Sequence, residues 1–431
     1  MRVLIVSYYW PPAGGVSVQR WLKFARYLPE FGVEPLIFVP ENASYPLLEP
    51  ELDQQVAEGL EIHKVPIWEI RNVYTKLMRK QTAGKSGIDG VFYLDSKQQS
   101  LKQRISLWIR SNLIFPDARM TWIRPCARAI KNYLKENEVD AIISTGPPHS
   151  CHLIALRVKQ SFPQLKWIAD FRDPWTNTEY FNRMPLTSWA RKHHASLERK
   201  VLTTADHVLT VSWSWSEEFR AAGAKAISVI TNGYDPSDFE QIIPEKTNKF
   251  VISHIGTLQD DRDPDEFWSL LANLVKEQEG FKERLEIRLV GLVAEGVKSS
   301  IAHHGLEKYT RYLGFTSHRE ALTHMKSSHI LLLLINNDER NARGRLPAKL
   351  YEYMAAGSRI IVFGPQTGDI EKILGPSILL HSPENTAIKK LIVELLTKQE
   401  VQPVKYDHGT YKRKGLTRQM SELIKEVIVR V

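Results

Sequence analysis

Short apolar runs alternate along the chain with longer segments whose apolar residues recur every three or four positions. Most runs contain no Gly or Pro, as expected of strands that are buried on both faces of a parallel sheet. The spacing in the longer segments is typical of amphipathic helices. The predicted strands are 3–7, 36–39, 140–145, 167–171, 207–212, 227–230, 250–255, 285–290, 312–315, 330–335 and 360–363. Because strands and helices alternate, we expect an α/β protein with doubly wound sheets.

The length of the chain indicates more than one domain. Its 431 residues are too many for one ordinary core and suit two α/β domains that face a cleft. The segment 234–247 is polar and contains Pro236 and Pro244, which predicts a linker. The last helix is expected to cross back to the first domain. The expected ranges are 1–235 and 248–410 for two Rossmann-like domains, about 66–125 for a basic helical insertion in the first, and 411–431 for the C-terminal crossover helix.

The N-terminus has a Rossmann-like opening. A strand is followed by the loop 11–15 and by a helix that begins at about Ser17. The loop contains Gly14 and Gly15 but no Gly-x-Gly-x-x-Gly pattern, and no acidic residue stands where a dinucleotide ribose would need one. A nicotinamide cofactor is therefore disfavoured.

The segment from Arg345 to Gly357 lies between two predicted buried strands and carries the clearest chemical signal. Pro347 is suited to the first turn of a helix, and Gly357 is suited to its left-handed end. The helix would carry Lys349 near its start and Glu352 on its second turn. Helix N-termini attract phosphate, and a carboxylate beyond the first turn accepts hydrogen bonds from a ribose diol. The segment therefore suits a nucleoside diphosphate.

The pattern Lys349-x-x-Glu352-Tyr-Met-Ala-x-Gly357 resembles the donor-nucleotide motif of retaining glycosyltransferases of the two-Rossmann-domain (GT-B) type, particularly family 4. The resemblance covers nearly the whole chain and implies that Glu352 binds the ribose of a nucleotide sugar. Gly344 stands where the family usually has a second Glu that contacts the donor sugar, and the Gly-x-x-Pro-x-Lys that follows resembles one bacterial branch. Thr257 stands where the family has an Arg.

The resemblance implies a phosphate-binding loop in the second domain. The loop begins at Gly256 and ends at Arg262, which stands where the family has a Lys. Arg262 and Lys349 are expected to neutralise the leaving diphosphate, since a guanidinium binds phosphate oxygens in pairs. The alternative for Arg262 is a local ion pair with one of the aspartates in 260–263.

The resemblance also implies roles for residues of the first domain. His149, which follows the strand 140–145, is expected to reach the donor sugar, and Asp173 is expected to act as general base towards the acceptor hydroxyl. Alternatively, Asp170 and Arg172 form a structural ion pair, and Asp173, which precedes a Pro, serves only to form a turn. The remaining expected contacts are Gly14, Asp170 and Arg172 for the acceptor, and Gly15, Gly256 and Gly344 for the donor.

A resident metal or cofactor is not expected. His149, Cys151 and His152 lie close in the sequence, but no further ligand cluster at suitable spacing supports a zinc site. Asp261-Arg-Asp263 is a weak match to the metal motif of the other main glycosyltransferase fold, which has one domain.

The formal net charge is +9, and many of the cations lie among apolar and aromatic residues in 71–133. Basic amphipathic helices there would bind an anionic membrane surface. The alternative is a solvated basic face, and nucleic acid is disfavoured because no known binding module accompanies the charge. Two cysteines and no spanning apolar segment favour a cytoplasmic protein, peripheral at the inner membrane face.

The leading interpretation is a metal-independent, retaining hexosyl-type glycosyltransferase of polysaccharide or glycolipid biosynthesis. Its partners would be a nucleotide sugar and a sugar or lipid-linked acceptor. One alternative is a nucleotide-sugar epimerase of the same fold. The other is a non-catalytic protein that binds nucleotide sugars, motivated by Gly344 and Thr257.

Overall fold

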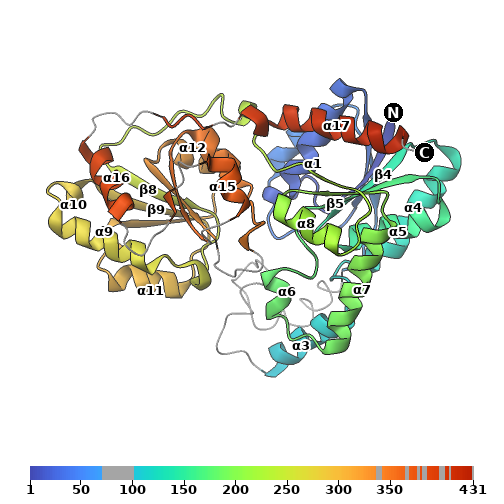
Figure 1. Ribbon diagram of the computed structural model, residues 1–431, viewed down its shortest axis with the longest axis horizontal. Helices are drawn as coiled ribbons and strands as arrows, with labels where there is room; N and C mark the ends of the chain where they lie inside the picture. Colours follow the sequence, from blue (N-terminus) through green and yellow to red (C-terminus); the bar gives the residue numbers. More distant parts are fainter. Residues whose placement is uncertain are drawn as a thin grey trace. The chain divides into compact units, whose positions relative to one another are not determined.

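The structure is a computed structural model. It describes residues 1–69, 101–335, 342–364, 368–375, 379–380, 386–397, 403–406 and 409–429. The chain divides into two compact units, Met1–Thr231 with Lys414–Val431, and Asn232–Arg413 (Figure 1). The expected basic insertion overlaps residues 70–100, which lie outside the described part.

The first unit contains a parallel sheet of seven strands in the order β3-β2-β1-β4-β5-β6-β7. The strands are β1 (Arg2–Val6), β2 (Glu34–Pro40), β3 (Glu61–Val65), β4 (Ala141–Gly146), β5 (Lys166–Phe171), β6 (His207–Thr210) and β7 (Ile227–Val229). The α/β fold prediction is confirmed. Strand β3 was not predicted, because its sequence Glu-Ile-His-Lys-Val is half polar and most of its positions are only partly buried.

Helices cover both faces of this sheet. The helices of the first unit are α1 (Val16–Tyr27), α3 (Leu101–Leu113), α4 (Met120–Glu136), α5 (Ser150–Ser161), α6 (Glu179–Arg183), α7 (Ser188–Thr204), α8 (Trp213–Ala221) and α17 (Arg413–Val429), and among the described residues α3 packs against α7 and not against the sheet. Alternate residues of β1 enter opposite cores: Leu4 packs with α4 and α5, whereas Val3 packs with α1 and α17. The C-terminal helix α17 therefore returns to the first unit, as predicted.

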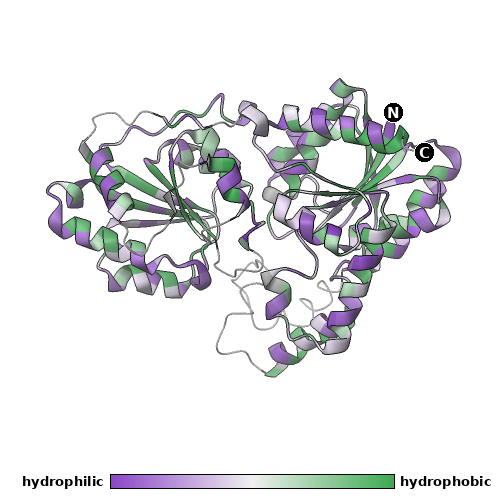
Figure 2. Cartoon of the chain, in the orientation of Figure 1, coloured by the Kyte–Doolittle hydropathy of each residue, from purple (hydrophilic) through white to green (hydrophobic). Residues whose placement is uncertain are grey.

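The second unit repeats the arrangement with six strands in the order β10-β9-β8-β11-β12-β13. Its strands are β8 (Phe250–Ile255), β9 (Leu285–Val290), β10 (Thr310–Gly314), β11 (Ile330–Leu334), β12 (Arg359–Phe363) and β13 (Leu379–Leu380). Its helices are α9 (Asp265–Glu277), α10 (Phe281–Arg284), α11 (Glu295–His303), α12 (His318–Lys326), α14 (Lys349–Ala356), α15 (Asp369–Leu374) and α16 (Thr386–Thr397). Figure 2 shows apolar strands enclosed by helices with polar outer faces, as amphipathic periodicity requires.

Each sheet has one point where the strand order reverses. In the first unit it lies between β1 and β4, and in the second between β8 and β11. Connections leave the sheet in opposite directions there, so the loops at the carboxyl ends of these strands are where open α/β sheets bind ligands. In each unit separately, the loops after these two strands are therefore where a ligand is expected: after β1 and β4 in the first unit, and after β8 and β11 in the second.

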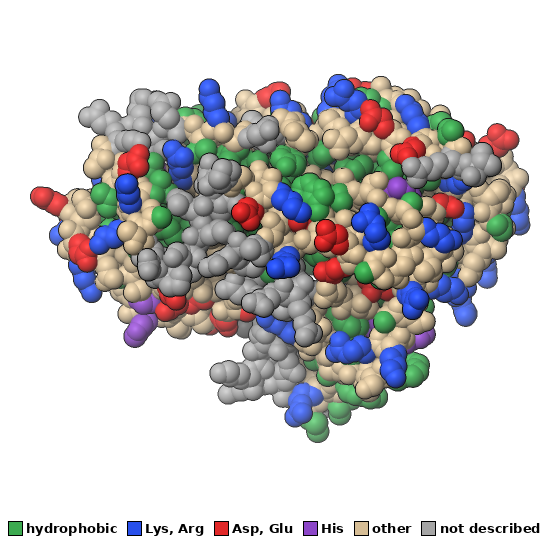
Figure 3. All heavy atoms as spheres, viewed as in Figure 1, with side chains coloured by type: hydrophobic (Ala, Val, Ile, Leu, Met, Phe, Trp, Pro, Cys, Tyr) green, Lys and Arg blue, Asp and Glu red, His purple; other side chains and the backbone are tan. Residues whose placement is uncertain are grey.

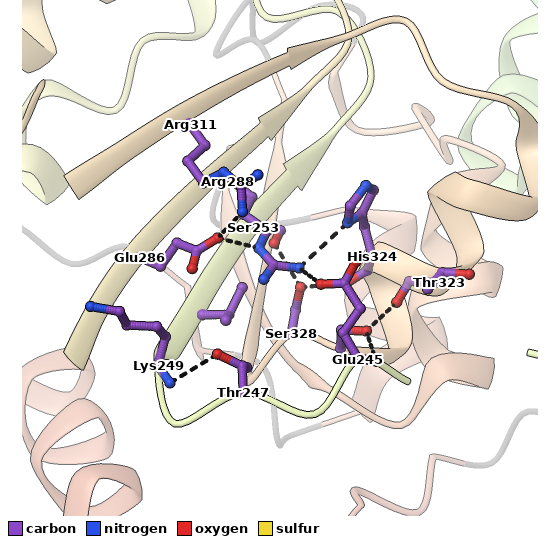
Figure 4. Close-up of polar contacts among 12 residues, drawn as sticks. Glu245, Thr247, Lys249, Ser253, Glu286, Arg288, Arg311, Thr323, His324 and Ser328 are labelled. Carbon is purple, nitrogen blue, oxygen red and sulfur yellow. Dashed lines mark hydrogen bonds and ion pairs between the residues drawn. The ribbon is translucent and has the colours of Figure 1, made fainter. Parts of the chain in front are cut away.

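The segment 234–247, predicted as a linker, is part of the second unit. The chain passes between the units at Thr231–Asn232. Glu245 forms an ion pair of 2.6 Å with the buried Arg288 of β9, whose Nε donates to Glu286 (Figure 4). This ion-pair cluster fixes the end of the segment to the second sheet.

Asp170, at the end of β5, joins separate elements of the first unit. Its side chain is fully buried. It accepts hydrogen bonds from Trp21 Nε1 at 2.7 Å and Thr145 Oγ1 at 3.0 Å, and it pairs with Arg20 at 3.2 Å. One carboxylate thus ties β5 to α1 and β4.

The partner of Asp170 differs from the sequence-based alternative of a pair with Arg172. Arg20 is the partner, and it also donates to the carbonyl oxygens of Ile230 and Thr231 at 2.9 and 2.8 Å. The pair therefore anchors the end of the first unit. Because the side chain of Asp170 has no exposed surface, its role is structural and it does not contact an acceptor.

Replacing Asp170 by Asn should strongly destabilise the first unit. The change leaves the Arg20 guanidinium buried without a counter-charge, so the free energy of unfolding should fall by about 3–5 kcal/mol. Urea denaturation measures this change. The control is Glu30→Gln, which breaks an exposed pair with Lys414 in the same unit and should lower stability by about 1 kcal/mol or less. Equal losses in the two variants would contradict the role given to Asp170.

Candidate nucleotide-sugar site

The loop after β1 needs both of its glycines. Gly15 precedes α1 with a φ of 84°. A Cβ at Gly14 would lie 2.7 Å from Cγ of Glu49, and the Gly15 amide donates to Glu49 Oε1 at 3.3 Å. A side chain at Gly14 would displace Glu49, and the left-handed backbone at Gly15 favours glycine, so both glycines at least serve local structure.

His149 lies directly before α5, at the end of the loop after β4. Its ring is stacked on Trp175, with centroids 4.8 Å apart and planes at 2°. Burial first, then the neighbouring His152 and Arg172, lower the pKa of His149 well below its ordinary value. His149 is therefore neutral near pH 7, and its Nδ1 has no hydrogen-bond partner among the described residues. A neutral imidazole offers one donor and one acceptor.

Gly146 was not singled out from the sequence, yet the two histidines require it. A Cβ at Gly146 would lie 2.6 Å from Nε2 of His152 and 3.2 Å from Nδ1 of His149. His152 lies inside α5, and Ser144 contacts its Nδ1 at 2.9 Å. Burial lowers the pKa of His152 to about 3. His152 is thus a neutral residue of the core.

Arg172 holds the loops of the first unit in place. Its Nη1 donates to the Ser17 carbonyl at 2.7 Å, Nε donates to the Gly146 carbonyl at 3.3 Å, and Nη2 donates to Pro147. Asp173, the next residue, is exposed. Of the predicted acceptor residues in this segment, Asp173 is therefore the one most accessible to a ligand.

In the second unit, Lys349 is the first residue of α14 and lies against the end of β8. Its Nζ donates to the Ile255 carbonyl at 2.9 Å and lies 3.3 Å from Nε2 of His254. Burial first, then the charge of Arg262, lower the pKa of Lys349 to about 7, against a smaller opposing effect of Glu352.

His254 was missed from the sequence because it lies inside a buried, mostly apolar strand. Its Nδ1 lies 2.9 Å from the Leu332 carbonyl, which identifies Nδ1 as the protonated nitrogen. Burial, Lys349 and Arg262 lower the pKa of His254 well below its ordinary value. The Nε2 lone pair is therefore directed at Lys349 and helps to fix its ammonium group.

Glu352 lies on the first turn of α14, not the second, because the helix begins at Lys349, two residues after Pro347. Its Oε1 accepts a hydrogen bond from Nε2 of His318 at 3.0 Å. The side chains of Glu352 and His318 are 19% and 23% exposed, so a ligand can reach the pair. His318, the first residue of α12, was also missed, since no motif surrounds it.

Arg262 ends a single helical turn, Asp260–Arg262, in the loop after β8. Its Nε lies 3.9 Å from Asp261, so the local pair considered above is present at long distance. Its charge lowers the pKa values of both Lys349 and His254. Gly256 begins the same loop with a φ of 117°, and a Cβ there would lie 3.3 Å from Lys349 Nζ.

The structure thus brings Gly256, Arg262, Lys349 and Glu352 together at the reversal point of the second sheet. Gly344 is buried in the segment that leads to α14. Across the described ranges, no group of three His, Cys, Asp or Glu side chains is arranged to hold a metal ion. Nor is any helix of the described residues long and apolar enough to cross a membrane.

Comparison with known proteins identifies one family model that matches part of the first unit. Residues 81–238, roughly a third of the chain, match the model of Glycosyltransferase Family 4. A search of curated proteins finds no match. The predicted resemblance to family 4 is therefore confirmed over the matched residues.

Solved structures share the fold over the whole chain. Sucrose-phosphate synthase from Thermosynechococcus elongatus matches with a TM-score of 0.57 and 12% identity, covering 100% of this chain and 96% of that one. The UDP-forming α,α-trehalose-phosphate synthase from Burkholderia vietnamiensis gives 0.62 and 8%, covering 100% and 99%. A chain described as a UDP-N-acetylglucosamine 2-epimerase from Listeria monocytogenes gives 0.55 and 11%, covering 99% and 96%. At these identities the likeness establishes the GT-B fold.

The lowered pKa of Lys349 predicts a pH dependence of stability. Between about pH 7 and pH 10, the unfolded chain retains a proton that folded Lys349 has released, so the free energy of unfolding should rise with pH, by up to about 1.4 kcal/mol per unit. Lys349→Met should remove this rise. Urea denaturation at pH 7 and pH 9 measures it, and the exposed Lys282→Met is the control. An unchanged pH dependence in Lys349→Met would show that Lys349 titrates at its ordinary pKa.

Proposed function

We propose that this protein is a retaining glycosyltransferase that transfers a hexosyl group from a nucleotide sugar to an acceptor hydroxyl, in polysaccharide or glycolipid biosynthesis. One observation carries the proposal. A lysine and an arginine converge on one loop of the second unit, beside a reachable carboxylate on the same short helix as the lysine. Two cations suit a diphosphate, and the carboxylate suits a ribose diol.

The leaving diphosphate is the part of the reaction that these cations serve. When the bond between the anomeric carbon and the diphosphate oxygen breaks, negative charge grows on that oxygen. Fixed cations stabilise this charge without reorganising. The diphosphate also stabilises the charged form of Lys349 when it binds, and so raises the pKa of Lys349. The positive end of α14 adds to the attraction.

The first unit contributes two proposed roles. Neutral His149 binds hydroxyl groups of the donor sugar, with its ring orientation fixed by stacking on Trp175. The exposed Asp173 accepts the proton of the acceptor hydroxyl as the new glycosidic bond forms. Gly14 and Gly15 have no side chains, so the acceptor and the donor can closely approach the backbone of the loop after β1.

The activity is tested by product analysis. The protein is incubated with a panel of nucleotide sugars, beginning with UDP-sugars because a structural relative is UDP-forming, and with sugar and lipid-linked acceptors. Proton NMR of the product should show the anomeric configuration of the donor. An inverted product would contradict the retaining mechanism.

The epimerase alternative is favoured by one neighbour of the same fold. Incubation of the nucleotide sugar without acceptor separates the two functions. An epimer of the sugar would support the epimerase, whereas unchanged nucleotide sugar, with transfer on adding acceptor, supports the transferase. Nucleotide binding without either product would support a non-catalytic binding protein.

Glu352→Gln should weaken binding of the cognate nucleoside diphosphate by about 1.5–3 kcal/mol, since a hydrogen bond to a charged group is lost. Isothermal titration calorimetry measures this change. Glu295→Gln, at an exposed position of α11, should leave affinity unchanged. If a folded Glu352→Gln protein binds the nucleotide as tightly as the wild type, Glu352 does not contact the ribose.

Helix α3 supports the proposal that the protein is peripheral to a membrane. Residues 71–100 of the predicted basic segment 71–133 lie outside the described residues. The exposed apolar residues of α3 are Leu101, Ile105, Trp108, Ile109 and Leu113. Their spacing places them on one side of the helix, and Figure 3 shows hydrophobic and basic side chains beside one another in this region. Such a face suits the boundary between headgroups and acyl chains.

Ile105→Ser with Ile109→Ser should reduce co-sedimentation with liposomes several-fold, because two buried apolar contacts with lipid are lost. The control is Ile243→Ser, at a position 82% exposed in the second unit. Equal liposome binding by the α3 variant and the control would leave α3 as an ordinary surface helix.

A further inference from the structure

A second cationic region lies far along the sequence from Lys349, on the helix pair α4 and α5 of the first unit. A hollow of about 470 Å³ opens between these helices. Its basic lining residues are Arg124, Arg128, Lys131 and Lys135 of α4 and Arg157 of α5. None of the described residues that line it is acidic. We call this region the α4–α5 groove, and Figure 3 shows Lys and Arg side chains gathered along this edge of the molecule.

The four cations of α4 form a row. Their spacings of four, three and four residues place them on one face of the helix. At 1.5 Å per residue, the row extends over about 16 Å. The opposite face of α4, with Trp122, Cys126 and Ile130, is buried in the core. The row is therefore carried by a helix that packing holds in a fixed orientation.

The groove cations lack counter-charges in the part of the chain that the structure describes. Arg124, Arg128, Lys131 and Arg157 form no ion pair with a described residue, and Lys135 contacts the neutral Asn132 at 3.4 Å. Elsewhere the chain does pair its cations, as at Arg20 and Arg288. Mutual repulsion of five unpaired cations is unfavourable in the absence of an anion.

The helix dipole accounts for only part of this arrangement. Lys131 and Lys135 lie towards the C-terminus of α4, where the dipole favours cations. Arg124 lies in the second turn and Arg128 in the middle, where the dipole gives no such benefit. Phe162, which caps α5, adds an apolar wall to the groove. The recess and the choice of Arg at three of five positions suit phosphate oxygens, which a guanidinium binds in pairs.

We propose that the α4–α5 groove binds an anion that carries several phosphate groups, either a soluble polyphosphate or the phosphate headgroups of an anionic bilayer. One phosphate would engage only two or three of the cations, whereas the length of the row matches several phosphates. The inference stands independently of the sugar-transfer reaction, because it uses none of the residues assigned to nucleotide binding.

The test compares the wild type with a triple variant, Arg124→Gln, Arg128→Gln and Arg157→Gln. All three positions are exposed, so the variant should fold normally, which circular dichroism checks. A matched control removes three exposed lysines of the second unit, with Lys276→Gln, Lys282→Gln and Lys390→Gln. The control changes net charge by the same amount and leaves the groove intact.

Two probes separate the sources of phosphate. Calorimetric titration with sodium tripolyphosphate measures soluble anion binding, and vesicles of phosphatidylglycerol or phosphatidylcholine measure lipid preference. The groove variant should lose at least about tenfold in tripolyphosphate affinity, in the phosphatidylglycerol preference, or in both. Loss with tripolyphosphate alone identifies a soluble ligand, and loss with vesicles alone identifies a bilayer. The control variant should match the wild type with both probes.

Three outcomes would overturn the proposal. The first is a groove variant that retains both kinds of binding. The second is an equal loss in the control variant, which would show a general effect of net charge. The third is tripolyphosphate binding that Lys349→Met abolishes and the groove variant retains, with equal phosphatidylglycerol preference in the groove and control variants, which would place the anion in the second unit. A failure of the proposed sugar transfer would change neither probe.

Discussion

The ammonium group of Lys349 is held against the end of a buried strand, and the chemistry of the second unit depends on this placement. A backbone carbonyl and a neutral imidazole hold it, while burial and Arg262 lower its pKa to about 7. A cation in such a place is at its most stable when an anion lies beside it. We propose that the fold thereby creates a site whose charges a ligand such as a diphosphate would balance.

Sheet topology explains why this lysine lies there. Strand order reverses between β8 and β11, so the loop after β8 and the helix that follows β11 approach the same edge of the sheet. Gly256 permits the approach, since a Cβ would lie 3.3 Å from the lysine nitrogen. In the first unit, the pair of Asp170 and Arg20 has the corresponding structural role, because it fixes β4, β5 and α1 around the loop that carries His149.

Most of the strands, although not β3 and β13, and the α14 segment were predictable from the sequence for physical reasons. Strands buried on both faces leave uninterrupted apolar runs, and Gly357 adopts the left-handed φ of 76° expected at a helix end. The side-chain partners were not predictable. Asp170 pairs with Arg20 and not with Arg172, which is only two residues away. The sequence does not reveal this pair, because 150 residues separate its two members and only the folded sheet brings them together. No sequence motif surrounds His254 or His318, so only the structure reveals their contacts with Lys349 and Glu352.

Hydrogen–deuterium exchange with and without the cognate nucleoside diphosphate tests most directly whether the second unit holds the nucleotide. We expect slower exchange in peptides that cover 254–263 and 346–357, because the ligand would order the loop after β8 and the start of α14. Peptides that cover α4 should be unaffected. Protection confined to the first unit, with these two segments unchanged, would contradict the assignment of the nucleotide site to Lys349, Arg262 and Glu352.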